Sequence, residues 1–184
     1  MRPNDDRLCD AAAMAKAIDA MASKLWGERR DGAPLHLVGI RSRGVPLAER
    51  LAASLRKLGA ENVDVGAVEI TLYRDDLGKT PVWPVLRGTE IPFDVESADI
   101  VLVDDVLFTG RTVRAALNAI CDLGRPTRVR LAVLVDRGHR ELPIRADVAG
   151  IEVPTEPGDR IKVQIMPIDS ADEVVKSYAN SPIA

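Results

Sequence analysis

The chain has 184 residues, of which 46% are hydrophobic, 29% charged and 3% aromatic, and its formal net charge is −3. This length and composition predict a single globular domain over residues 1–184. The negative net charge and the few aromatic residues exclude a general nucleic-acid binder, so DNA is not an expected partner.

The sequence contains no apolar run approaching the roughly 20 residues that a membrane helix needs, so no membrane association is expected. The N-terminal segment "MRPNDDRLCD" lacks the basic region and apolar core of a secretory signal. We therefore expect a cytoplasmic protein.

Hydrophobic periodicity predicts an alternation of helices and strands. In chain order the predicted elements are a helix over 10–28, a strand over 35–40, a helix over 45–59, a strand over 63–73, a strand over 100–105, a helix over 111–123, a strand over 129–136 and a strand over 160–165. Near-continuous apolar strands that alternate with helices predict an α/β fold, with a parallel central sheet covered by helices on both faces.

The connection over 74–97 is rich in proline and glycine. A loop of this length inside a compact domain is typical of a functional lid, and a surface excursion is the alternative. The tail over 166–184 shows only a weak pattern.

The segment "IVLVDDVLFTGRT" (100–112) runs from an apolar strand into two acids, Asp104 and Asp105, and then into a loop that opens a helix. The first N–H groups of a helix lack intrahelical partners and attract anions, so Thr109, Gly110, Arg111 and Thr112 favour a phosphate. The acids then lie where they could accept hydrogen bonds from a sugar, or could help to hold Mg²⁺. The alternative is that one acid caps the turn and the other faces solvent.

The segment "IRSRG" places Arg41, Ser42, Arg43 and Gly44 after another strand. Gly44 can adopt a positive backbone angle that turns N–H groups inward, and two arginines offset negative charge, so this loop predicts a second anion site. Because ligands of parallel sheets bind beyond the carboxyl ends of the strands, the two loops should share one crevice. Two anion sites that flank a sugar site fit phosphoribosyl pyrophosphate.

The segment "IVLVDDVLFTGRT" (100–112) resembles the phosphoribosyl pyrophosphate motif of the type I phosphoribosyltransferases. The blocks "LVGIRSRG", "EITLYRDDL", "DDVLFTGRTVRAAL", "LGRP" and "LAVLVDRGHRELPIRAD" further resemble those of the bifunctional pyrimidine operon regulators with uracil phosphoribosyltransferase activity. The resemblance covers about residues 35–165 and implies the type I phosphoribosyltransferase fold, with a small hood beside the parallel sheet.

The resemblance implies that uracil and phosphoribosyl pyrophosphate are converted with Mg²⁺ into uridine monophosphate (UMP) and pyrophosphate. Asp104 and Asp105 would hold the ribose hydroxyls, and Mg²⁺ would be bound through the substrate, with the same two acids as candidate ligands. Arg74, at the start of the lid, is the further catalytic candidate. The remaining candidates are Val106, Leu107, Phe108, Thr109, Gly110, Arg111 and Thr112 for the 5'-phosphate, Arg41, Ser42, Arg43 and Gly44 for pyrophosphate, and Arg137 and Ile161 for the base.

The resemblance also implies binding of the leader of pyrimidine messenger RNA and a homodimer or higher homo-oligomer. The candidate RNA-binding residues are the arginines Arg125, Arg128, Arg140 and Arg145, to which Arg130 could add. Two alternatives stay open: a phosphoribosyltransferase for another base without RNA regulation, and a receiver-like phosphoacceptor domain, because "VLVDD" also occurs in such domains.

Overall fold

Two sheets organise the chain. The computed structural model describes residues 5–29, 34–73 and 88–178. The elements in chain order are β1 (Asp5–Cys9), α1 (Ala11–Gly27), β2 (Leu35–Ile40), α2 (Gly44–Lys57), β3 (Val63–Val68), the short 3₁₀ helix η1 (Thr71–Tyr73), β4 (Asp99–Leu107), α3 (Arg111–Cys121), β5 (Arg128–Asp136), β6 (Val148–Glu152), β7 (Arg160–Gln164) and β8 (Glu173–Ser177). None of the helices among these residues is both long and apolar enough to cross a membrane.

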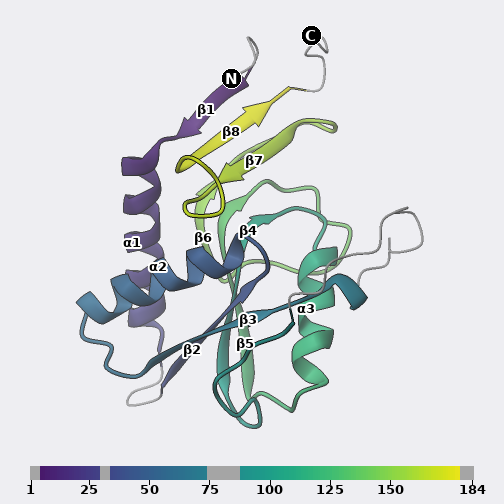
Figure 1. The fold of residues 1–184 in the computed structure, drawn as a ribbon. Coiled ribbons are helices and arrows are strands. Elements are labelled where there is room, and N and C mark those ends of the chain that lie inside the picture. Colours follow the sequence, from purple (N-terminus) through teal and green to yellow (C-terminus); the bar gives the residue numbers. More distant parts are fainter. Residues whose placement is uncertain (1–4, 30–33, 74–87, 179–184) are drawn as a thin grey trace.

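The larger sheet has the strand order β3-β2-β4-β5-β6 within the described chain, and its neighbouring strands are parallel. Helices α1 and α2 cover one face, and α3 covers the other (Figure 1). The prediction of a parallel sheet with helices on both faces is confirmed.

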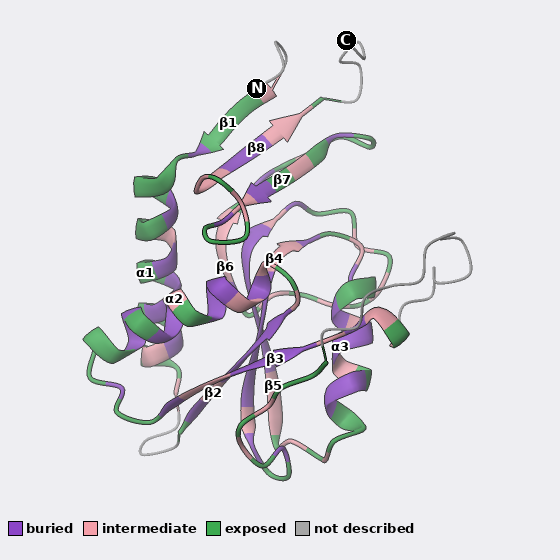
Figure 2. Ribbon diagram, viewed as in Figure 1, coloured by how far each residue is buried: buried purple, intermediate pink, exposed green. Residues whose placement is uncertain are grey.

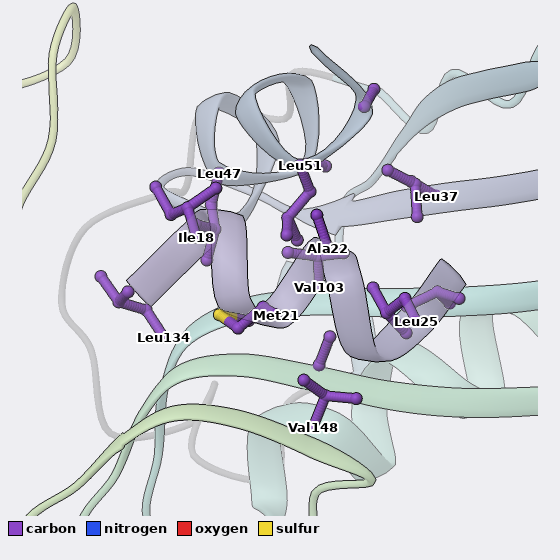
Figure 3. Close-up of a cluster of buried hydrophobic side chains, with 14 of the residues drawn as sticks. Ile18, Met21, Ala22, Leu25, Leu37, Leu47, Leu51, Val103, Leu134 and Val148 are labelled. Carbon is purple, nitrogen blue, oxygen red and sulfur yellow. The ribbon is translucent and has the colours of Figure 1, made fainter. Parts of the chain in front are cut away.

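The central strands are buried along most of their length, whereas the helices are exposed on their outer sides (Figure 2). On the face covered by α1, the helix inserts Ile18, Met21, Ala22 and Leu25 between α2 and the sheet (Figure 3). These residues recur at helical spacing, so one stripe of α1 faces the core while its polar side chains stay in water. Asp10 caps the helix by accepting a hydrogen bond from the Ala13 N–H at 2.9 Å.

The smaller sheet is antiparallel with the order β1-β8-β7 in the described residues, and it forms a hood beyond the carboxyl ends of the parallel strands (Figure 1). Strand β7 was predicted, but the sequence analysis missed β1, β6 and β8. Both β1 and β6 lie at sheet edges and have mixed burial, so neither shows a clear alternation of apolar and polar residues.

The strand predicted over 63–73 is too long, because β3 ends at Val68. The carboxylate of Glu69 accepts hydrogen bonds from the Thr71 N–H at 3.0 Å and from the Thr71 hydroxyl at 2.6 Å, which turns the chain into η1. The predicted lid falls mainly on residues 74–87, which lie outside the described residues. On its far side, Glu90 forms an antiparallel bridge with Ala67 of β3.

Candidate functional site

The candidate site lies where the strand order of the parallel sheet reverses. From β2 the chain continues to β3 on one side, and from β4 it continues to β5 and β6 on the other. Because β2 and β4 are neighbours with Gly39 opposite Val103, the loops that follow both strands open onto the same edge. This is the position where open α/β sheets bind ligands.

Asp104 and Asp105 lie on β4 between these loops. The strand was predicted to end at the acids, over residues 100–105. It continues instead to Leu107, because Val106 and Leu107 still pair with Val135 and Asp136 of β5. The carboxylate of Asp104 accepts a hydrogen bond from the Asp105 N–H at 3.0 Å, and that of Asp105 accepts one from the Val106 N–H at 3.0 Å.

Both acids are held in an environment that disfavours their charge. Asp104 is only 6% exposed. Burial and then the neighbouring Asp105 charge raise the pKa of Asp104 well above its usual range. Burial also raises the pKa of Asp105, although the hydrogen bond with Asp104 and the positive charge of Arg43 oppose this rise. Because their charge is disfavoured, the two carboxylates would be stabilised by hydrogen bonds donated from hydroxyl groups or by a nearby cation.

The loop after β4 ends in Gly110, which has a φ of 91° and forms the N-terminal cap position of α3. Within the described chain the cap residue makes no side-chain hydrogen bond to this helix, which leaves N–H groups of its first turn able to donate to an anion. The Arg111 N–H lies 3.4 Å from the Thr109 hydroxyl, and the Arg111 guanidinium pairs with Glu141 at 2.8 Å. The geometry suits an anion.

We expect substitution of Gly110 by Ala to destabilise this loop. A left-handed conformation costs a residue with a Cβ about 1–2 kcal/mol. The added Cβ would also lie 3.3 Å from Ile144, which has to shift. Urea unfolding should show a lower free energy of unfolding for G110A than for wild type. The matched variant is G88A, also at positive φ but with no described residue within 4 Å of its added Cβ, which should show the backbone cost alone.

The loop after β2 is folded tightly against the strand ends. A Cβ on Gly39 would lie 2.5 Å from the Gly44 carbonyl oxygen, and a Cβ on Gly44 would lie 2.4 Å from the Val103 carbonyl oxygen. Gly44 does not have the positive φ that was predicted; it is needed because the backbones of α2 and β4 approach too closely for a side chain. The loop 41–43 is thereby fixed beside the acids.

Both arginines of this loop already have carboxylate partners, which the sequence analysis did not foresee. Arg43 donates to both oxygens of Asp169 at 2.8 and 2.9 Å, and Arg43 in turn lowers the pKa of Asp169. Arg41 donates to the Gly88 carbonyl at 3.0 Å and lies 3.3 Å from Glu90. Asp169 and Glu90 are far from Arg43 and Arg41 in the sequence, so no local pattern pointed to these pairs.

The candidate base-binding residues lie toward the hood. The Arg137 guanidinium lies 4.0 Å from the centre of the Phe108 ring, and Arg137 donates to the Asp159 carbonyl at 2.7 Å. Ile161 is partly buried on β7. The structure thus brings Arg137 and Phe108 together, while Ile161 approaches from the smaller sheet. Arg74 lies outside the described residues.

Arg140 has a central place between the loops after β4 and β5. It donates to the carbonyls of Phe108 and Gly138 at 2.9 Å each and of Ile144 at 3.1 Å, and it pairs with Asp136. Arg140, a candidate for RNA binding, therefore already has these hydrogen-bond partners within the protein. Arg140 thereby holds the two loops together.

The other arginines proposed for RNA differ in exposure. Arg125 and Arg145 are exposed, whereas Arg128 pairs with Asp99 at 2.6 Å. Arg130 is 5% exposed, and burial lowers its pKa. A groove of about 580 Å³ along β6 is lined by Arg145 and Lys24 but also by Asp147 and Glu152, so its charges are mixed.

No cluster of three or more His, Cys, Asp or Glu residues with metal-ligand geometry occurs in the described ranges. The donors available at the site are the adjacent carboxylates of Asp104 and Asp105. Such a set suits Mg²⁺, which commonly takes one or two carboxylates and completes its shell with substrate oxygens and water.

The fold, the acid pair at the switch point and the two flanking loops define a phosphoribosyltransferase. The family model for the phosphoribosyl transferase domain matches residues 5–165. A crystal structure of a hypoxanthine-guanine phosphoribosyltransferase from Bacillus anthracis superposes with a TM-score of 0.71, covering 94% of this chain and 97% of that one. The two sequences are 14% identical, so this likeness concerns the fold.

More similar sequences narrow the class. The chain is 52% identical over 173 residues to the "Bifunctional protein PyrR" of Chloroflexus aurantiacus, with 94% of both chains covered. It is 55% identical over 159 residues to the protein of the same name from Deinococcus deserti, covering 86% of this chain and 87% of that one. The chain belongs to the PyrR family of phosphoribosyltransferases, which confirms the family and the enzyme class predicted from the sequence.

Proposed function

We propose that the protein transfers the phosphoribosyl group of phosphoribosyl pyrophosphate to uracil, giving UMP and pyrophosphate. The observation that carries this proposal is the acid pair at the switch point, a buried Asp104 and a partly buried Asp105, between the start of α3 and the arginines of the loop 41–43. One loop suits the 5'-phosphate, the other suits pyrophosphate, and the acids between them suit the ribose hydroxyls.

In this reaction the bond between the ribose C1' and the pyrophosphate oxygen breaks, and a bond between C1' and a uracil nitrogen forms while that nitrogen loses its proton. The sugar carries positive charge in the transition state. Asp104 and Asp105 would orient the ribose by accepting from its hydroxyls, and Arg41 and Arg43 would stabilise the charge on the leaving pyrophosphate. Arg137 and Ile161 would border the base.

We infer that Mg²⁺ is the cofactor. Bound to the diphosphate oxygens of the substrate, with Asp104 or Asp105 near by, it would neutralise charge on the leaving group. The protein's own contribution is to hold the sugar and both phosphate ends in place. Omitting Mg²⁺ from the assay and restoring it tests this dependence.

The decisive experiment compares uracil with orotate, hypoxanthine and guanine in one assay of pyrophosphate release. We expect release with uracil and much slower release with the other bases. Absence of uracil-dependent release in the presence of Mg²⁺ would reject the proposal, and preference for a purine would favour the alternative of another base.

A second activity is proposed because the curated relatives are named bifunctional and because Arg125 and Arg145 are exposed. The protein would bind the leader of pyrimidine messenger RNA through phosphate contacts, as a homodimer or higher homo-oligomer. Titration with a pyrimidine leader RNA at physiological salt should give tighter binding than with a scrambled RNA. Equal affinity would reject the activity, and light scattering reports the oligomeric state.

A further inference from the structure

Lys176 of β8 is a lysine whose ammonium group is largely enclosed by the hood. Its side chain is 13% exposed, and the ammonium lies 3.1 Å from the Asp159 carboxylate, itself only 4% exposed. It also donates to the Pro154 carbonyl at 3.2 Å and lies 4.9 Å from the centre of the Tyr178 ring. Burial of a lysine is costly unless its charge is paired, so this position needs a structural or functional reason.

The two groups that Lys176 contacts stand at opposite ends of the connection from β6 to β7. Pro154 follows shortly after β6, and Asp159 directly precedes β7. Between them the connection is closed on itself, because the Asp159 carboxylate accepts from the Glu156 N–H at 2.9 Å and the Asp159 N–H donates to the Glu156 carbonyl at 3.1 Å. Lys176 therefore clamps both ends of one compact segment, residues 154–159.

The segment 154–159 in turn holds the residues that border the candidate base site. The Asp159 carbonyl accepts from Arg137 at 2.7 Å in a buried bond, and the Thr155 hydroxyl donates to the Arg137 carbonyl at 2.9 Å. The Thr155 carbonyl lies 2.6 Å from the His139 Nε2. The position of Arg137 thus depends on the shape of this segment.

Arg137 lies between the hood and the loop after β4. Its guanidinium covers the Phe108 ring, and its buried Nε has no hydrogen-bond partner among the described residues. A buried donor without a partner is costly, so a polar ligand atom that reached this nitrogen would be bound favourably. Ile161, the other residue proposed for the base, is the cross-strand partner of Lys176.

We propose that Lys176 is a positioning residue for the base: through the segment 154–159 it fixes Arg137 over Phe108 and so sets the affinity for uracil. This inference rests on the proposed function, but it makes a separate demand on the kinetics. Loss of the clamp should affect the base and leave phosphoribosyl pyrophosphate almost untouched, since the hydrogen bonds of the acids and of Arg41 and Arg43 described above go to Val106, Asp169 and Gly88, outside this segment.

The test uses the variant Lys176→Met, with the double variant K176M/D159N as a second form that leaves no unpaired buried charge. Lys162→Met, which removes an exposed lysine from the neighbouring strand, is the matched control. We expect kcat/KM for uracil to fall by about 10²-fold, the size of a ~1 Å misplacement, while the KM for phosphoribosyl pyrophosphate stays within about twofold of wild type. Lys176→Arg, which keeps the charge, should recover part of the loss.

Hydrogen exchange gives a readout that does not depend on activity. The Glu156 amide should exchange faster in K176M and in K176M/D159N than in wild type, and at the wild-type rate in K162M. Unchanged uracil kinetics, or an equal loss for both substrates, would overturn the positioning role, as would unchanged exchange at Glu156. A wild-type protein that uses another base would instead reject the proposed function, and the same comparison of KM values would then be made with that base.

Discussion

Replacement of Asp105 by Asn should lower kcat/KM for phosphoribosyl pyrophosphate by about 10- to 100-fold, because a hydrogen bond to a charged group contributes about 1.5–3 kcal/mol. The amide keeps the shape of the side chain and can still accept from the Val106 N–H, so the loop should be preserved. The variant loses the negative charge that we propose accepts hydrogen bonds from the ribose hydroxyls. Steady-state rates with phosphoribosyl pyrophosphate varied at saturating uracil measure the effect.

Asp94→Asn is the control for this variant, because Asp94 is exposed on a loop that precedes β4. It should leave kcat/KM at the wild-type value. An Asp105→Asn enzyme with wild-type kcat/KM would show that the acid does not hold the sugar.

The Asp105→Asn variant should be more stable than wild type at neutral pH. The pKa of Asp105, like that of Asp104, is raised in the folded protein, so stability is lost as the pH rises from the unfolded to the folded pKa values, and the full penalty is present above the latter. Below the unfolded pKa the acids are protonated in both states, and this penalty disappears. Thermal unfolding should therefore show a higher Tm for D105N at pH 7–8 and a difference that narrows as the pH falls toward about 4, the ordinary pKa of an aspartate. The acid pair would then be an example of stability given up for function.

Replacement of Arg140 by Met should cost about 1–3 kcal/mol of folding free energy, the range for partners that lose a hydrogen bond, because the ion pair with Asp136 is only partly buried. Asp136 would lose its partner, and the carbonyls of Phe108, Gly138 and Ile144 would lose a shared donor. Urea unfolding of the variant against wild type measures this loss.

Arg145→Met provides the comparison, because Arg145 is exposed and comes from the same segment. Its free energy of unfolding should stay within about 0.5 kcal/mol of wild type, as is usual at surface positions. A double variant R140M/D136N should recover part of the stability, since it removes the unpaired carboxylate. An R140M protein as stable as wild type would mean that the loops do not depend on this arginine.

The parallel sheet could be predicted because its strands are buried on both faces and therefore appear as continuous apolar runs. Strand β2 was predicted over the same residues, 35–40, that form it in the structure. The hood was harder to predict, since β1 and β8 come from opposite ends of the chain and pair only after folding. No local signal reports such a pairing.

For the site, Asp104, Asp105 and Gly110 could be proposed from the sequence because they lie in one segment whose residue types point to one chemistry. Asp169, Glu90 and Lys176 were missed for the opposite reason. Each acts through a partner far away in the sequence, and an isolated acid or lysine is by default a solvated surface group. Arg140 shows that an arginine expected at the surface can also bond to backbone carbonyls of loops that no local pattern brings together.

The ion pairs Arg41–Glu90 and Arg43–Asp169 have a consequence for which molecules can occupy the loop 41–43. An incoming anion must displace carboxylates that already satisfy these guanidinium groups. A monovalent buffer ion offers no more charge than it replaces, whereas a polyanion that reaches both arginines at once offers a net gain. If the loop 41–43 binds pyrophosphate as proposed, competition from these carboxylates would favour multivalent ligands, and it would ease release of the product because Glu90 and Asp169 can pair with the arginines again.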